Sequence, residues 1–127
     1  MALNLPKQMV VAEVGPRDGL QSFGRWIATD TKVEMIDRLS DLGLPVIEVS
    51  SFAHPKVVPH LRDAEEVFER IKRRPGTIYR ALVPNARGAE RAAAAQVGEM
   101  LGLITISATY TRKNQNIGAR FDALSCK

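Results

Sequence analysis

Residues 9–21 have the sequence MVVAEVGPRDGLQ, in which an apolar run leads directly into a polar turn. The run from Met9 to Val14 is typical of a buried strand, and Gly15 and Pro16 are expected to end it. The turn is not the G-x-G-x-x-G turn that holds a dinucleotide, and that motif occurs nowhere else in the chain. Pro16 also lacks a backbone N–H, which such a turn directs at phosphate. The sequence therefore disfavours a dinucleotide-binding fold.

Beyond this segment, apolar runs alternate with amphipathic stretches at a spacing of about 30 residues. Strands are predicted at residues 9–14, 46–50, 78–83 and 100–107, and helices from Thr29 or Thr31 to Gly43, from Asp63 to Pro75, and from Ala86 to Gln96. Thr31 and Glu34 fit a capping box at the start of the first helix. The continuous apolar residues of the fourth strand favour burial on both faces. This order predicts an α/β fold with parallel strands, either a doubly wound open sheet or part of an eight-stranded barrel.

The composition is that of a soluble globular domain, with 127 residues, 45% of them apolar, and a net charge of +4. The basic residues are scattered, and the densest run, Lys72–Arg74, is expected at the end of a helix, so no nucleic-acid partner is predicted. The single cysteine, Cys126, is interpreted as a tail thiol that cannot form an internal disulfide. No apolar run approaches the ~20 residues of a membrane span, so a cytoplasmic location without membrane contact is expected.

Polar side chains follow each predicted strand, where the carboxyl ends of parallel strands carry the reacting groups of a barrel. These residues are Arg17, Asp18 and Gln21 after the first strand, Glu48, Ser50 and Ser51 at the second, Asn85 after the third, and Ser107, Thr109, Lys113 and Asn114 at the fourth. His54 and His60 are six residues apart and are interpreted as solvated loop residues, not as paired metal ligands. Trp26 is interpreted as a loop anchor against the core.

Arg17 and Asp18 are the most informative pair. The carboxylate can bind a hard divalent cation while the guanidinium faces substrate oxygens, although a surface ion pair in a turn would look the same. Glu48 ends an apolar strand, where an ionised carboxylate needs a partner, and Arg17 is the expected one. A purely structural Arg17–Glu48 pair remains the alternative.

These residues resemble the signature of the hydroxymethylglutaryl-CoA lyase family, which belongs to a superfamily of metal-dependent barrels. The matching blocks are Ala12–Gln21, Ile47–Phe52, Pro55–Pro59, Leu82–Asn85 and Thr111–Asn114. The resemblance runs from about residue 8 to residue 116. It implies that residues 1–127 are one partial TIM-barrel domain with strands one to four of the (β/α)8 barrel, strands five to eight being absent. A whole barrel needs about 250 residues.

The resemblance implies cleavage of 3-hydroxy-3-methylglutaryl-CoA to acetyl-CoA and acetoacetate with Mg or Mn, in leucine breakdown and ketone-body formation. Asp18 resembles the family's metal-binding aspartate, Arg17 the arginine that stabilises the enolate, and Glu48 the acidic residue that supports the catalytic site. The remaining residues carried over to substrate binding beside Arg17 are Gln21, Ser51 and Asn85.

The family's other metal ligands, a His-x-His pair and an asparagine, and its catalytic cysteine in a Gly-rich loop have no counterpart in this chain. The chain alone is therefore expected to be inactive. Its expected partners are an acyl-CoA substrate and either a second copy or a complementing half-barrel. The alternatives are a catalytically incomplete half-barrel that serves in assembly or binding, and a related acyl-CoA condensing enzyme.

Overall fold

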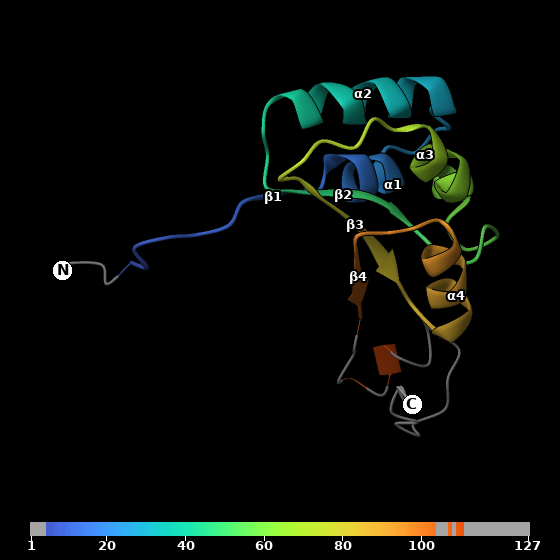
Figure 1. Ribbon diagram of the computed structural model, residues 1–127. Helices are drawn as coiled ribbons and strands as arrows, with labels where there is room; N and C mark the ends of the chain where they lie inside the picture. The colour runs from blue at the N-terminus through green and yellow to red at the C-terminus, as the bar shows by residue number, and fades with distance from the viewer. Residues whose placement is uncertain (1–4, 104–106, 108, 111–127) are drawn as a thin grey trace.

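The computed structural model describes residues 5–103, 107, 109 and 110. Four parallel strands form one sheet in the order β1-β2-β3-β4 (Figure 1). The strands are β1 (Ala12–Glu13), β2 (Val46–Ser51), β3 (Ile78–Val83) and β4 (Glu99–Gly102). The helical elements are the π-helical turn η1 (Gly15–Gly19), α1 (Leu20–Ser22), α2 (Thr29–Asp41), the 3-10 turn η2 (Pro59–Leu61), α3 (Ala64–Arg70) and α4 (Ala86–Ala94). The predicted alternation of parallel strands with helices is confirmed.

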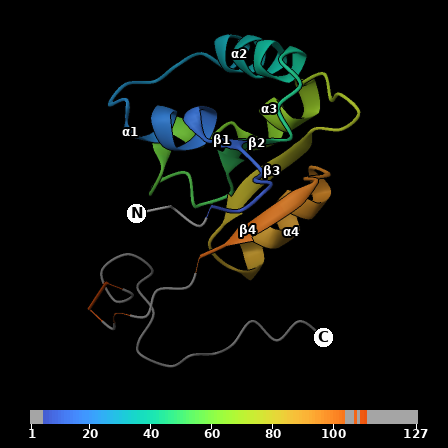
Figure 2. The ribbon, with the colours of Figure 1, turned by 90° about the vertical axis from the view of Figure 1, so that its left-hand side faces the viewer.

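The three longer helices cover one face of the sheet, each lying beside the strands that it connects (Figures 1 and 2). Ile36 of α2, Phe68 of α3 and Ala92 of α4 are almost fully buried and pack with Ile47 and Ala81 of the sheet in one apolar core. Burial of such side chains contributes roughly 1.5–3 kcal/mol each for the larger ones. The helix-facing side chains of β2 and β3 therefore hold the helices against this face of the sheet, and the helices leave the opposite face uncovered (Figures 1 and 2).

The first strand is shorter and more exposed than predicted. Only Ala12 and Glu13 pair with β2, and Met9, Val10 and Val11 are 74%, 73% and 55% exposed. The prediction of a buried strand over residues 9–14 is wrong for most of its length. The reason is that β1 is an edge strand within the described part of the chain and has a neighbour on one flank only.

The predicted capping box is also wrong. Helix α2 begins at Thr29 after Ala28, and no side chain caps it. Thr29 instead donates its hydroxyl to Asp63 at 2.8 Å. The end of this helix is as predicted, because Gly43 follows it with a φ of 71°, which glycine adopts without a steric penalty.

The basic run Lys72–Arg74 follows α3 in an irregular segment and is not part of that helix, so the prediction of its position is wrong, as is the extension of the helix to Pro75. Arg73 donates to the carbonyl of Ala95, just beyond α4, at 3.1 Å. Arg74 pairs with Asp41, the last residue of α2, at 2.5 Å. Arg73 and Arg74 thus bind near the C-terminal ends of α4 and α2, where helix dipoles favour positive charge.

Strand β4 covers the beginning of the predicted fourth strand, and residues 104–106 of that prediction lie outside the described residues. Its side chains alternate between half-buried and exposed, and Met100 is 40% exposed. The expectation of burial on both faces is wrong here, because β4 pairs only with β3 within the described part.

Gly88 in α4 tests the packing of this helix against the end of β2. A Cβ at this position would lie 2.9 Å from the backbone oxygen of Phe52 and 3.3 Å from Pro84. Gly88→Ala is therefore expected to lower the free energy of unfolding by about 2 kcal/mol, despite the higher helix propensity of alanine. Urea unfolding measures this effect. Gly102→Ala, whose Cβ would meet nothing within 4 Å, is the control, and a stabilised Gly88→Ala would contradict the packing described.

Candidate active site

Arg17, in the turn that follows β1, lies between the carboxylates of Asp18, in the same turn, and Glu48, the third of the six residues of β2. The prediction that Glu48 ends its strand is therefore wrong, because β2 continues to Ser51. Its Nε donates to Oε1 of Glu48, and its Nη1 donates to Oδ1 of Asp18 at 3.0 Å. The Glu48 side chain is 3% exposed, Arg17 is 17% exposed and Asp18 is 60% exposed. The predicted pairing of Arg17 with Glu48 is confirmed. The buried carboxylate of Glu48 thus fixes the Arg17 guanidinium, while the carboxylate of Asp18 faces solvent.

The turn that presents these two side chains is a π-helical turn and not a simple loop. The backbone N–H groups of Arg17 and Asp18 both donate to the carbonyl of Val14, at 3.1 and 2.8 Å. The N–H of Gly15 donates to Glu13 Oε1 at 2.6 Å, and a Cβ on Gly15 would approach that oxygen to 2.8 Å. The close approach explains why glycine suits this position. The same turn sequence that disfavours a dinucleotide site therefore folds into this π-helical turn and directs Arg17 towards Glu48.

A β-bulge in β2 determines which of its side chains reach the same face as Glu48. The register to β3 shifts between Glu48 and Ser50, so that Glu48 pairs with Arg80 and Ser51 pairs with Leu82. Arg80 and Leu82 are two residues apart and share a face, so Glu48 and Ser51 share it too. In a regular strand, three residues would separate them onto opposite faces. The bulge therefore places Ser51 on the face that carries the Arg17–Glu48 pair.

The other predicted substrate-binding residues differ in how far the structure constrains them. Ser51 is buried, and its hydroxyl accepts the N–H of Ala53 at 3.2 Å. Gln21 lies on α1 and is exposed. Asn85 caps α4, because its side-chain oxygen accepts the N–H of Gly88 at 2.9 Å. Substrate contacts by these three residues stay predictions.

Sequence reasoning missed a second ion pair on this face of the sheet. Arg80 lies next to Glu48 in register, and its guanidinium pairs with Glu99 of β4 at 2.7 Å. The Nε of Arg80 is buried without a hydrogen-bond partner in the described structure. An arginine in the middle of an apolar strand was the available signal. Glu48, Arg80 and Glu99 form a row of alternating charge across β2, β3 and β4.

The residues described here fit only part of a metal site. Asp18 offers an exposed carboxylate oxygen of the kind that Mg or Mn binds. No group of three histidine, cysteine, aspartate or glutamate side chains with suitable geometry is found among the residues that the structure describes. A role of Asp18 as a metal ligand therefore stays a prediction.

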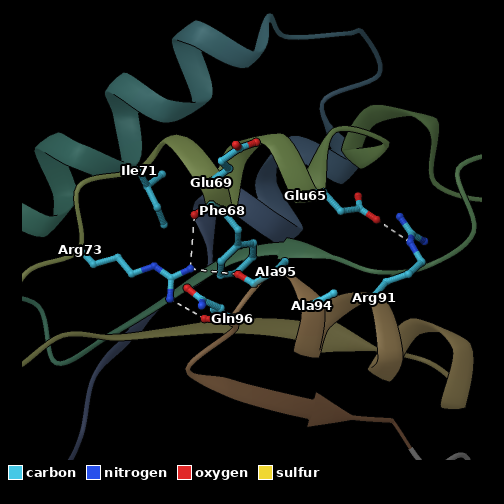
Figure 3. Close-up of a pocket in the computed structure, with 9 residues that line it drawn as sticks. All are labelled: Glu65, Phe68, Glu69, Ile71, Arg73, Arg91, Ala94, Ala95 and Gln96. Carbon is cyan, nitrogen blue, oxygen red and sulfur yellow. Dashed lines mark hydrogen bonds and ion pairs between the residues drawn. The ribbon is translucent and has the colours of Figure 1, made fainter.

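A cleft between α3 and α4 lies away from these residues (Figure 3). Its volume is about 710 Å³, and Arg73 and Arg91 are among the residues that line it. Arg91 pairs with Glu65 at 2.6 Å, and Arg73 donates to backbone carbonyls at the ends of both helices. Both arginines already bind groups within the protein, so we interpret the cleft as a packing gap between α3 and α4 and do not assign it to catalysis.

Several predictions concern other parts of the chain. His54 is an exposed loop residue, as predicted, whereas His60 is half-buried. The prediction that Trp26 anchors its loop against the core is wrong, because Trp26 is 37% exposed and its ring contacts the cations of Lys32 and Arg62, each 3.9 Å from the ring centroid. Lys113, Asn114 and Cys126 lie outside the described residues. No helix among the described residues is both long enough and apolar enough to cross a membrane.

The sequential parallel sheet, with Arg17 and Asp18 in the turn after β1 and Glu48 within β2, has the arrangement of part of a TIM barrel. The HMGL-like family model matches residues 8–122. The chain belongs to the HMGL-like family, which includes the hydroxymethylglutaryl-CoA lyases.

Curated relatives and solved structures agree with this assignment. The chain is 49% identical over 111 residues to hydroxymethylglutaryl-CoA lyase of Bacillus subtilis, covering 87% of this chain and 37% of that protein. It is 43% identical over 125 residues to the mitochondrial hydroxymethylglutaryl-CoA lyase of Homo sapiens, covering 94% of this chain and 38% of that protein.

Two solved structures show the same arrangement of elements. The HMG-CoA lyase structure from B. subtilis matches with a TM-score of 0.85 and 47% identity, over 90% of this chain and 38% of that one. An HMG-CoA lyase from Acinetobacter baumannii in complex with coenzyme A and 3-methylmalate matches with a TM-score of 0.83 and 44% identity, over 87% of this chain and 36% of that one. The chain thus spans little more than a third of the length of the relatives that it matches.

Proposed function

We propose that this chain carries the Arg17–Asp18–Glu48 portion of a hydroxymethylglutaryl-CoA lyase site. In the complete site, 3-hydroxy-3-methylglutaryl-CoA would be cleaved to acetyl-CoA and acetoacetate. The observation that carries the proposal is the arginine held by a buried glutamate beside an exposed aspartate, in a chain of the HMGL-like family. Coenzyme A bound to the A. baumannii relative supports an acyl-CoA substrate.

The chemistry requires positive charge at a fixed point. A base removes the proton of the tertiary hydroxyl, the adjacent carbon–carbon bond breaks, and its electron pair moves onto the thioester as an enolate. Arg17 is suited to stabilise that enolate, because Glu48 fixes the guanidinium before the substrate arrives and little reorganisation is needed. Protonation of the enolate carbon then gives acetyl-CoA, and the former hydroxyl carbon becomes the ketone of acetoacetate.

Asp18 would hold the divalent cation, Mg or Mn, together with ligands that the described residues do not supply. The cation would contribute positive charge beside the hydroxyl and carboxylate oxygens of the substrate. Gln21 and Ser51 would border the same space, and Asn85 would contribute from the end of β3. A role in leucine breakdown and ketone-body formation follows only if this substrate is the physiological one.

A second candidate is a catalytically incomplete half-barrel that assembles with a partner. It is favoured by the exposed apolar side chains at both edges of the sheet, Met9 and Val10 beside β1 and Met100 and Leu103 at β4. Apolar surface of this kind marks an interaction site or an aggregation-prone edge. The partner would be a complementing half-barrel or a second copy of this chain.

A chimera tests the proposed activity directly. Residues 8–122 replace the matching segment of the B. subtilis relative, and acetoacetate release from 3-hydroxy-3-methylglutaryl-CoA is measured with Mg or Mn. The chimera is expected to keep turnover within about tenfold of that relative, because the site geometry is retained. A folded chimera that condenses an acyl-CoA with a keto acid but releases no acetoacetate would favour the related condensing enzyme instead.

A further inference from the structure

Lys32 in α2 is a buried cation outside the Arg17–Asp18–Glu48 site. It is 3% exposed, and its Nζ donates to Oδ1 of Asp63 and to the carbonyl oxygen of His60, both at 2.7 Å. A buried ammonium group is tolerated only when it is paired and hydrogen-bonded in this way. Lys32 therefore connects α2 to the segment that runs from η2 into α3.

The side chain of Asp63 binds Lys32 and does not cap α3, the helix that Asp63 precedes. It occupies the N-cap position of α3, yet its side chain makes no capping hydrogen bond. Its carboxylate is 7% exposed and accepts hydrogen bonds from Lys32 and, at 2.8 Å, from the hydroxyl of Thr29. An aspartate at this position would ordinarily cap the helix. The Asp63 carboxylate therefore binds two residues of α2, Thr29 and Lys32, in place of the backbone N–H groups of α3.

Trp26 extends the contact to the loop between α1 and α2. The Nζ of Lys32 and the Cζ of Arg62 each lie 3.9 Å from the centroid of its ring. Arg62 directly follows η2, and α1 packs against η2. Cation–π contacts at this distance favour a fixed loop, most strongly where the cation is desolvated, as Lys32 is.

We propose that the Lys32–Asp63 ion pair is a positioning device for the segment 15–28, which carries Asp18 and Gln21. Both of these side chains are exposed, so burial does not fix them. Trp26, four residues after the end of α1, is held against Lys32 and Arg62, and this anchors α1 on η2. The inference rests on the proposed function only in naming this segment as part of a site. The positioning itself is independent of turnover.

The test uses the whole chain and needs no substrate. The double variant Lys32→Met with Asp63→Asn removes both charges together, so neither is left buried and unpaired. Hydrogen exchange is followed at the backbone N–H groups of residues 15–22, Pro16 excepted, and, for comparison, at those of β2 and β3. The expected result is exchange about tenfold faster in residues 15–22, with β2 and β3 unchanged. The control removes the pair Arg91–Glu65, which joins α3 and α4, through Arg91→Met with Glu65→Gln, and is expected to leave residues 15–22 unchanged.

Trp26 is the single tryptophan of the chain and gives a second readout. Acrylamide quenching of its fluorescence is expected to increase about twofold in the double variant and to stay constant in the control. Unchanged exchange and quenching, or an equal rise in the loop and in β2 and β3, would overturn the proposal. If the double variant does not fold, hydrogen exchange in the unaltered chain tests the proposal instead. The N–H groups of Asp18 and Leu61 should then open as one unit, and independent opening would contradict the proposal.

Discussion

Arg17→Met is expected to abolish most turnover of a completed enzyme and to destabilise the fold at the same time. Removal of one preorganised charge from a reacting oxyanion costs about 10²–10³ in turnover. The same change leaves Glu48, which is 3% exposed, without its cation, and an unpaired buried charge costs about 3–5 kcal/mol of unfolding free energy. Turnover in the chimera and urea unfolding of this chain measure the two effects.

A second substitution separates the two roles of Arg17. Arg17→Met combined with Glu48→Gln removes the uncompensated charge, so most of the lost stability is expected to return. Turnover is expected to stay low, since no guanidinium remains to stabilise the enolate. Recovery of turnover together with stability would mean that Arg17 is a structural partner of Glu48 and nothing more.

Asp18→Asn is expected to lower turnover strongly and to leave the stability of the fold almost unchanged. Asp18 is 60% exposed, and its contact with Arg17 is of the kind that contributes about 1 kcal/mol or less, so stability should hardly change. Turnover with Mg or Mn is expected to fall at least about 100-fold, because a charged ligand to the cation is replaced by a neutral amide. Assays of the chimera over a range of Mn concentrations measure both the affinity and the maximal rate.

The control for Asp18→Asn is Asp41→Asn at the end of α2. Asp41 is 58% exposed and also pairs with an arginine, Arg74, so the chemical change and the exposure are closely matched. Its variant is expected to keep full turnover. Equal losses in the two variants, or a full rate for Asp18→Asn at low Mn, would contradict the role of Asp18 as a metal ligand.

The sheet and its helices could be predicted because local sequence specifies them. The apolar runs at β2 and β3 and the glycine after α2 are short-range signals, and the structure follows them. The pairing of Arg17 with Glu48 could also be predicted, since parallel strand ends meet at one edge and a buried carboxylate needs a cation. The error at β1 has a tertiary cause, because an edge strand lacks the second neighbour that would bury it.

The β-bulge and the Lys32–Asp63 pair could not be read from the sequence. A one-residue shift between Glu48 and Ser50 depends on how β2 meets β3, yet it decides that Ser51 faces the same side as Glu48. Lys32 and Asp63 are 31 residues apart, and each alone looks like an ordinary surface charge or a helix cap. Long-range contacts of this kind bring together the parts of the candidate site that local pattern leaves separate.

The most direct test of the central claim is complementation with this chain as it is. The chain is mixed with the portion of the B. subtilis relative that it does not match, and acetoacetate release from 3-hydroxy-3-methylglutaryl-CoA is measured with Mn. The proposed function predicts no release by either part alone, release by the mixture, and loss of that release with Arg17→Met. A mixture that associates but releases no acetoacetate, or one that remains fully active with Arg17→Met, would contradict the claim that this chain carries the arginine–aspartate portion of a lyase site.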